Sequence, residues 1–241
     1  MFKLKIADVV FGVHPIYADC KRFCSDFIYA GAEEPEFIIK IEKSDIEREK
    51  SACYPEDYPE SYLETLALSR IFSSKLLSQY QGMLFHCSSV KYNGNAYLFT
   101  APSGTGKSTH ASYWKRLLGD KAVIINDDKP IIRRINGKFY LFGSPWNGKH
   151  HIGVNDYAPL KAICVLTRGE QNSIEKINAE KAIPVLLEQT VRPSNAEDMF
   201  KLLDLIDAIV KESGLYLLKC NIDPESAKVS FKGMVGEDYE T

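Results

Sequence analysis

The stretch Ala101-Pro-Ser-Gly-Thr-Gly-Lys107-Ser108 constrains this chain more than any other part of its sequence. It has the pattern of a Walker A phosphate-binding loop, with Ala101 in place of the first glycine. Gly104 and Gly106 allow the backbone to turn successive N–H groups inward, Lys107 can reach the β and γ phosphates of a nucleotide, and Ser108 can ligate Mg²⁺. The expected nucleotide-binding residues are Ser103, Gly104, Thr105, Gly106, Lys107, Ser108 and Thr109.

The surroundings of this loop favour a phosphate site over a chance Gly-rich turn. The apolar run 96–100 predicts a strand directly before it, and 109–118 has a helical pattern directly after it. Strand, loop and helix therefore occur in the order that a phosphate loop requires.

The rest of the chain predicts an α/β fold with mixed sheets, and we expect one domain over 1–241. Asn93-Gly94 and Asn136-Gly137 each separate two apolar runs, which is the strongest short hairpin signal. Residues 1–82 are expected to form N-terminal strands, with 20–28 as a possible helix, then an exposed connection over 42–59 and an amphipathic helix ending near Gly82. Residues 83–241 are expected to form the nucleotide-binding core. Its further expected elements are strands at 84–92, 160–166 and 215–220 and helices at 183–189, 196–210 and 224–234.

Composition limits the classes of partner. With 30 Lys and Arg against 32 Asp and Glu, the formal charge is -2, so no basic excess points to nucleic acid or to an anionic membrane. The six cysteines are too sparse for a disulfide scaffold, and Cys20 and Cys24 are expected to be buried thiols. No apolar run reaches the roughly 18 to 20 residues that span a bilayer. We therefore expect a cytoplasmic protein, and a homo-oligomer remains open.

An acidic pair follows the next buried strand. Residues 123–125 are apolar, and Asn126-Asp127-Asp128 come directly after them. Carboxylates at that end of a strand would face the phosphate loop, where one can hold Mg²⁺ and the other can accept a proton from an attacking hydroxyl. The alternative is a turn in which Asp is favoured by its side-chain to backbone bonds. Which carboxylate takes which role stays open, although Asp127 is the expected metal ligand together with Ser108.

These features together resemble the catalytic domain of HPr kinase/phosphorylase, in the phosphoenolpyruvate carboxykinase-like superfamily. The resemblance covers 85–128: a strand with His86 before a hairpin, the loop SGTGKST, and a strand ending in Asp127-Asp128. It implies an HPr kinase-like fold that uses ATP and Mg²⁺, with His86 beside the reacting phosphate. One position departs, because HPr kinases have Glu directly after the loop serine where this chain has Thr109.

A second cluster of cations lies in 143–151. Gly143-Ser-Pro-Trp-Asn-Gly-Lys149-His-His151 combines two glycines, Trp146 and three possible cations. Lys149 is the best candidate to neutralise charge on a transferring phosphoryl group, and Trp146 is expected to cover the nucleotide when this loop closes. A solvated turn is the plainer interpretation. Arg192 is a weaker candidate.

The leading hypothesis is an ATP-dependent kinase that acts on a hydroxyl of a peptide, a protein or a small molecule. Its expected catalytic residues are Asp127, Asp128, His86 and Lys149. The alternative is a nucleotide-binding regulatory protein or ATPase without an acceptor. A binding module without turnover is disfavoured by the intact Lys107, Ser108 and acidic pair.

Overall fold

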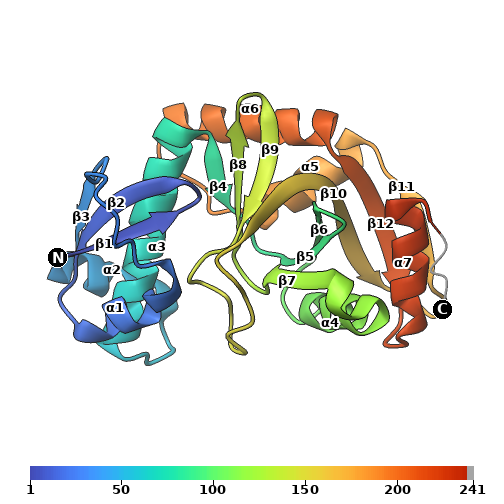
Figure 1. The fold of residues 1–241 in the computed structure, drawn as a ribbon, viewed down its shortest axis with the longest axis horizontal. Helices are drawn as coiled ribbons and strands as arrows, with labels where there is room; N and C mark the ends of the chain where they lie inside the picture. Colours follow the sequence, from blue (N-terminus) through green and yellow to red (C-terminus); the bar gives the residue numbers. More distant parts are fainter. Residues whose placement is uncertain (238–241) are drawn as a thin grey trace.

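A computed structural model describes residues 1–237, which form a three-stranded sheet, a nine-stranded sheet and seven α-helices (Figure 1). The small sheet lies with α1 and α2 at the N-terminal end of the molecule, and α3 lies between it and the large sheet. The mixed α/β class predicted from the sequence is confirmed. Among the described residues, no helix has the length and apolar character needed to cross a membrane.

The small sheet begins with a hairpin, although residues 4–13 form one apolar run in the sequence with no sign of a turn. β1 (Phe2–Ile6) and β2 (Val9–His14) pair antiparallel, and β3 (Ile38–Lys40) pairs parallel with β2. Ala7 and Asp8 turn the chain with φ of 51° and 60°. The predicted helical character of 20–28 is present in α1 (Ala18–Phe23) and a following 3-10 turn (Ser25–Phe27). Cys20 and Cys24 are both buried thiols, as expected.

The expectation of a plain connection over 42–59 is wrong, because this segment contains α2 (Lys43–Cys53). A capping box starts the helix: the Glu42 carboxylate accepts from the backbone of Asp45, and the Asp45 carboxylate accepts from the backbone of Glu42. Ile46 is its one buried residue, so the apolar stripe that signals a helix is almost missing. α3 (Glu60–Tyr80) follows, and its C-cap Gln81 lies next to Gly82, where the amphipathic pattern predicts the end of the helix.

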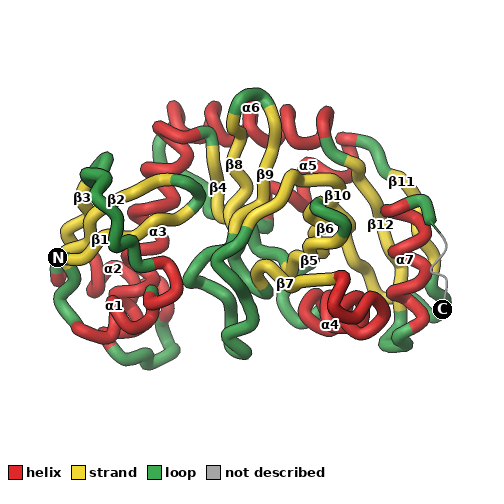
Figure 2. The backbone as a smooth tube through the Cα atoms, in the orientation of Figure 1, coloured by secondary structure: helices red, strands yellow, loops and turns green. Residues whose placement is uncertain are grey.

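The large sheet branches at one long strand. β10 (Tyr157–Arg168) pairs antiparallel with β9 through its first residues, and its remainder lies between β6 and β12, parallel to both. The sheet curls around this strand (Figure 2). The other strands are β4 (Gly82–Leu84), β5 (Ser88–Tyr92), β6 (Asn95–Thr100), β7 (Ala122–Asn126), β8 (Ile131–Ile135), β9 (Lys138–Phe142), β11 (Ser173–Lys176) and β12 (Gly214–Cys220).

Both Asn-Gly hairpins are confirmed. Asn93 and Gly94 have φ of 49° and 73° between β5 and β6, and Asn136 and Gly137 have φ of 50° and 77° between β8 and β9. Positive φ at both central residues gives a turn whose twist matches that of the paired strands.

Four helices cover the two faces of the large sheet (Figure 1). One side carries α4 (Lys107–Leu118) and α7 (Glu225–Val235), which pack around the buried Trp114 and Phe231. The other carries α5 (Ala179–Glu188) and α6 (Ala196–Glu212), each started by an asparagine cap. Pro184 lies inside α5, which continues through it.

One predicted strand is wrong in a way that matters for the site. The run 84–92 is divided between β4, which pairs with β8, and β5, which pairs with β6 and β7. His86 therefore lies in the crossing segment rather than within a strand. Phe85 N–H donates to Pro130 O at 3.0 Å and Cys87 N–H donates to Asp128 O at 3.0 Å, so the crossing lies along the acidic turn.

Candidate active site

The phosphate loop joins the end of β6 to the start of α4. Gly104 and Gly106 have φ of 76° and 111°, and an added Cβ would meet nothing within 4 Å at either position. The first N–H groups of α4 have no acceptor within the helix, and no side chain caps them. This arrangement is a donor-rich concavity suited to an anion.

Lys107 is buried in this loop, with 7% of its surface exposed. Its Nζ donates to Ala101 O at 2.9 Å. Burial lowers the pKa of Lys107. The far side of the loop is held by Arg168 at the end of β10, whose Nη2 donates to Gly104 O at 3.1 Å. No motif in the sequence marks Arg168.

The acidic turn after β7 is fixed by Asn126. Its Oδ1 accepts from the backbone N–H of Asp128 and of Lys129, both at 2.9 Å, and its Nδ2 donates to Ser144 O at 3.0 Å. Asp127 is buried, and its Oδ1 accepts from Ser88 Oγ at 2.7 Å. The turn conformation that the sequence offered as an alternative is present, and it holds both carboxylates in place.

His86 lies beside the second carboxylate. Its Nε2 is 3.4 Å from Asp128 Oδ1, and its Nδ1 is 2.8 Å from Gln189 Oε1 at the end of α5. Burial is the main cause of the lowered pKa of His86, and the charge of Lys107 adds to it. The ring is therefore neutral at neutral pH. Gln189 is 103 residues away in the sequence, so sequence reasoning had no signal for it.

A cavity of about 800 Å³ brings the expected residues together. Every expected site residue lines it except Thr105, and Lys129 joins them. Arg192, the weaker candidate, is exposed and does not line the cavity. The expected residues that line it are His86, Ser103, Gly104, Gly106, Lys107, Ser108, Thr109, Asp127, Asp128 and Lys149.

The cation-bearing segment also reaches the cavity, but Trp146 differs from the expectation. It is buried, and its Nε1 donates to Thr65 O of α3 at 2.9 Å. Trp146 therefore anchors the segment to α3 instead of moving as a cover. Lys149, His150 and His151 line the cavity beyond it. Gly148 has φ of 76°, and a Cβ there would lie 3.1 Å from Asp128 Cβ, so both the backbone conformation and the close approach favour glycine.

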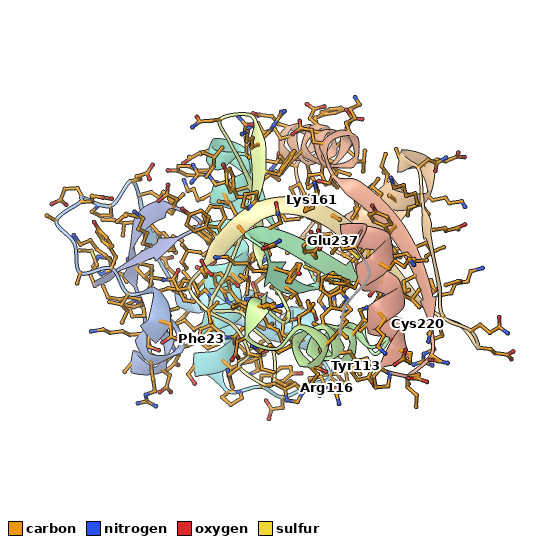
Figure 3. All side chains as sticks on the ribbon, turned by 45° about the vertical axis from the view of Figure 1, so that its right-hand side comes forward. Phe23, Tyr113, Arg116, Lys161, Cys220 and Glu237 are labelled. Carbon is orange, nitrogen blue, oxygen red and sulfur yellow. The ribbon has the colours of Figure 1, made fainter. Side chains whose placement is uncertain are left out.

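The N-terminal elements supply a wall of the cavity that the sequence did not predict. Its residues are Phe23, Tyr58, Tyr62, Thr65 and Leu66. In Figure 3 the labelled Phe23 lies at the border between the N-terminal elements and the rest of the molecule. Tyr58 precedes Pro59, the N-cap of α3, and only Tyr62 lies within the helix, so helical spacing gives no signal that the two rings share this wall.

A family model described as "SynChlorMet cassette protein ScmC" matches residues 62–204, more than half of the chain. The chain belongs to the ScmC family. The ScmC match begins in α3 at Tyr62 and includes the phosphate loop, the acidic turn, Lys149 and Gln189.

The other comparisons add little to the ScmC assignment. No curated protein matches the sequence. A solved structure, "Structure of the Hpr(Ser) kinase/phosphatase from Coxiella burnetii", is similar over 64% of this chain and 93% of its own, with 10% identity and a TM-score of 0.37. The chemistry of this ScmC site therefore rests on its own residues.

The ScmC site offers oxygen donors for a magnesium ion. Within residues 1–237, no three His, Cys, Asp or Glu side chains gather to hold a metal by protein ligands alone. Mg²⁺ does not need such a set, since it is commonly bound by one or two carboxylates together with substrate phosphates and water. Asp127 and Ser108 line the same cavity and provide a carboxylate and a hydroxyl, so this donor set fits Mg²⁺.

Proposed function

We propose that this chain is an ATP-dependent kinase that transfers the γ-phosphoryl group of ATP to a hydroxyl acceptor. The observation that carries the proposal is the single cavity in which the phosphate loop, the acidic turn, His86 and Lys149 meet. A phosphate cradle alone supports binding, whereas a cradle facing a carboxylate and a histidine supports transfer.

Phosphate binding falls to the loop. The N–H groups of the loop and of the first turn of α4 are donors suited to binding an anion, and Lys107 supplies positive charge. Lys107 would exchange its contact with Ala101 O for phosphate oxygens, which are stronger acceptors for an ammonium group than a neutral carbonyl. Lys149 would meet the charge that develops on the transferring group.

The surroundings of the two carboxylates favour different roles. Asp127 is buried and oriented by Ser88 Oγ, as is typical of a metal ligand that a neighbouring group holds in place. Asp128 is partly exposed and lies beside His86, so it is open to a second substrate. We assign Asp127 and Ser108 to Mg²⁺ and Asp128 to the general base. Bound Mg²⁺ would neutralise phosphate charge.

In the proposed step the acceptor oxygen forms a bond to the γ phosphorus, and the bond from that phosphorus to the oxygen bridging the β phosphate breaks. The acceptor proton moves to an Oδ atom of Asp128, and ADP leaves with the bridging oxygen. Neutral His86 can donate from Nε2 to Asp128 and so orient the carboxylate. Nδ1 of this tautomer is an acceptor, so the Gln189 side-chain amide must present its NH₂ group, which a half-turn of the amide brings to the position of Oε1.

The test is transfer of labelled γ-phosphate from ATP to a panel of serine peptides and small hydroxyl compounds. We expect ADP release that depends on an acceptor. Lys107→Ala should weaken MgATP binding by at least about tenfold, because it removes charged hydrogen bonds to phosphate. The matched control is Lys121→Ala, an exposed lysine near the end of α4. ADP release without any acceptor would favour an ATPase, and unchanged MgATP affinity in Lys107→Ala would refute the phosphate site.

A further inference from the structure

The N-terminal side of the cavity carries an aromatic wall, a name used here for Phe23, Tyr58, Tyr62 and Leu66. None of these side chains can neutralise a phosphate. Tyr58 and Tyr62 are each 42% exposed, and their ring centroids are 5.1 Å apart with the planes inclined at 48°. Two adjacent rings in a cavity form a binding surface for an aromatic or branched apolar group.

Hydrogen bonds link the α3 part of this wall to the acidic turn. Thr65 Oγ1 donates to Tyr62 O at 2.7 Å, and Trp146 Nε1 donates to Thr65 O at 2.9 Å. Trp146 O in turn accepts from Lys129 N–H at 3.0 Å, and Lys129 follows Asp128 directly. Tyr62 and the proposed general base are thus connected through a buried tryptophan, and both line the same cavity.

The phenol of Tyr62 lies within electrostatic reach of Asp128. Burial is the main cause of the raised pKa of Tyr62, and the charges of Tyr58 and Asp128 add to it. The Tyr62 phenol is therefore neutral at neutral pH and places no second negative charge in the cavity beside that of Asp128. The phosphates, in contrast, are bound by the loop and α4, and Figure 1 shows α4 on the opposite side from α1 and α3.

We propose that the aromatic wall is the acceptor site and that it selects hydroxyl compounds with an aromatic or bulky apolar group next to the hydroxyl. The inference rests on the proposed function, since a hydroxyl that loses its proton to Asp128 must lie within hydrogen-bond reach of that carboxylate. The remainder of the acceptor then lies within the same cavity, whose lining includes Tyr58 and Tyr62. Burial of its apolar group against the rings provides affinity that the phosphate loop cannot give.

Two blocked dipeptides test the selection: N-acetyl-Ser-Phe amide and N-acetyl-Ser-Gly amide. Each is titrated by calorimetry into the full chain saturated with MgADP, and each is assayed separately for phosphate transfer from ATP. We expect the Phe amide to bind at least about tenfold more tightly than the Gly amide. Tyr62→Ala, alone and with Tyr58→Ala, should reduce this ratio toward one, while Tyr62→Phe should preserve it because the ring remains.

The controls separate the wall from the nucleotide site. Affinity for MgADP should change by less than about twofold in the tyrosine variants. Phe200→Ala, which removes an exposed ring from α6, should leave the ratio of Phe amide to Gly amide affinity unchanged. Equal binding of the two amides to the parent would overturn the inference, as would a loss of MgADP affinity in Tyr62→Ala, which would assign the wall to the nucleoside. A Phe preference without phosphate transfer would support the wall and refute the kinase reaction.

Discussion

Asp127 and Asp128 are neighbours in the sequence with different surroundings, and this difference predicts different phenotypes. Asp127→Asn retains an oxygen for Ser88 but loses the charge that attracts Mg²⁺, so the Mg²⁺ concentration needed for half-maximal rate should rise. Asp128→Asn should keep MgATP affinity and lower turnover by about 100-fold or more, as expected for loss of a general base. Magnesium titrations of the rate and calorimetry with MgATP measure the two effects.

The control for both variants is Asp120→Asn, which changes a fully exposed carboxylate at the end of α4. It should leave both quantities at the parent value. If Asp127→Asn and Asp128→Asn behave identically in both measurements, the division of roles between them is wrong.

His110 gives a prediction about stability and pH. It lies within α4, where its Nε2 is 2.8 Å from Ser230 Oγ of α7, and burial lowers its pKa to about 4. An unfolded chain returns this histidine to its usual 6.5, so the unfolded state binds a proton more readily between these values. Stability should therefore fall by up to about 3 kcal/mol as the pH is lowered from 6.5 to 4.

Urea unfolding at pH 7, 5.5 and 4.5 measures this dependence. His110→Gln can still donate to Ser230 and does not titrate, so its stability should fall less over the same range. Other titrating groups, His86 included, are present in both proteins and cancel in the comparison. Parallel pH profiles for parent and variant would contradict the assignment to His110.

At the scale of elements, local signals were reliable where a turn or a loop determines the structure. Both Asn-Gly hairpins and the strand, loop and helix of the phosphate site follow from residues close together in the sequence. The prediction of one strand over 84–92 was wrong because the two halves of this run pair with different strands: β4 pairs with β8, and β5 pairs with β6 and β7. Periodicity within one segment contains no information about a change of pairing partner.

The contact between α3 and the 143–151 segment can be tested through Trp146. Trp146→Phe keeps an aromatic ring near Phe72 but removes the donor to Thr65 O. Thr65 lies inside α3, so its carbonyl keeps its acceptor role in the helix. The variant therefore loses one buried hydrogen bond, which is worth about 0.5 to 1.5 kcal/mol, and urea denaturation should show a loss of about that size. Trp114→Phe removes a donor to Ser230 at the far side of the sheet and serves as the matched control. Trp114→Phe should lower the free energy of unfolding without changing acceptor affinity, whereas Trp146→Phe should lower both quantities.

At the scale of the whole molecule, one apolar cluster joins the N-terminal elements to the large sheet. Phe11 and Phe72 belong to the same cluster as Ile131, Phe142 and Trp146. We therefore expect one unfolding transition for the whole chain. Phe72→Ala should lower stability by about 3 to 5 kcal/mol and shift the signals of Trp114 and of the N-terminal tyrosines together. Two separate transitions, one for each part, would refute a shared core.

The site itself was predictable only in part, because its members come from distant segments. The phosphate loop and the acidic pair are short motifs, so they are visible in the sequence. Gln189, Arg168 and Tyr62 reach the site through α5, β10 and α3 respectively, and their positions depend on tertiary packing. The order of elements in the chain gives no signal for such an arrangement.

The position of β6 has a consequence for the newly synthesised chain. β6 carries the phosphate loop, and one of its two edges is covered only by residues 160–165 of β10. A ribosome that has reached residue 156 has already made every predicted phosphate and carboxylate residue, yet the edge with the buried Leu98 and Phe99 is still open. Open apolar strand edges promote aggregation. A shortened chain of residues 1–156 should therefore sediment as aggregates, and the nucleotide site becomes functional only when synthesis has passed β10.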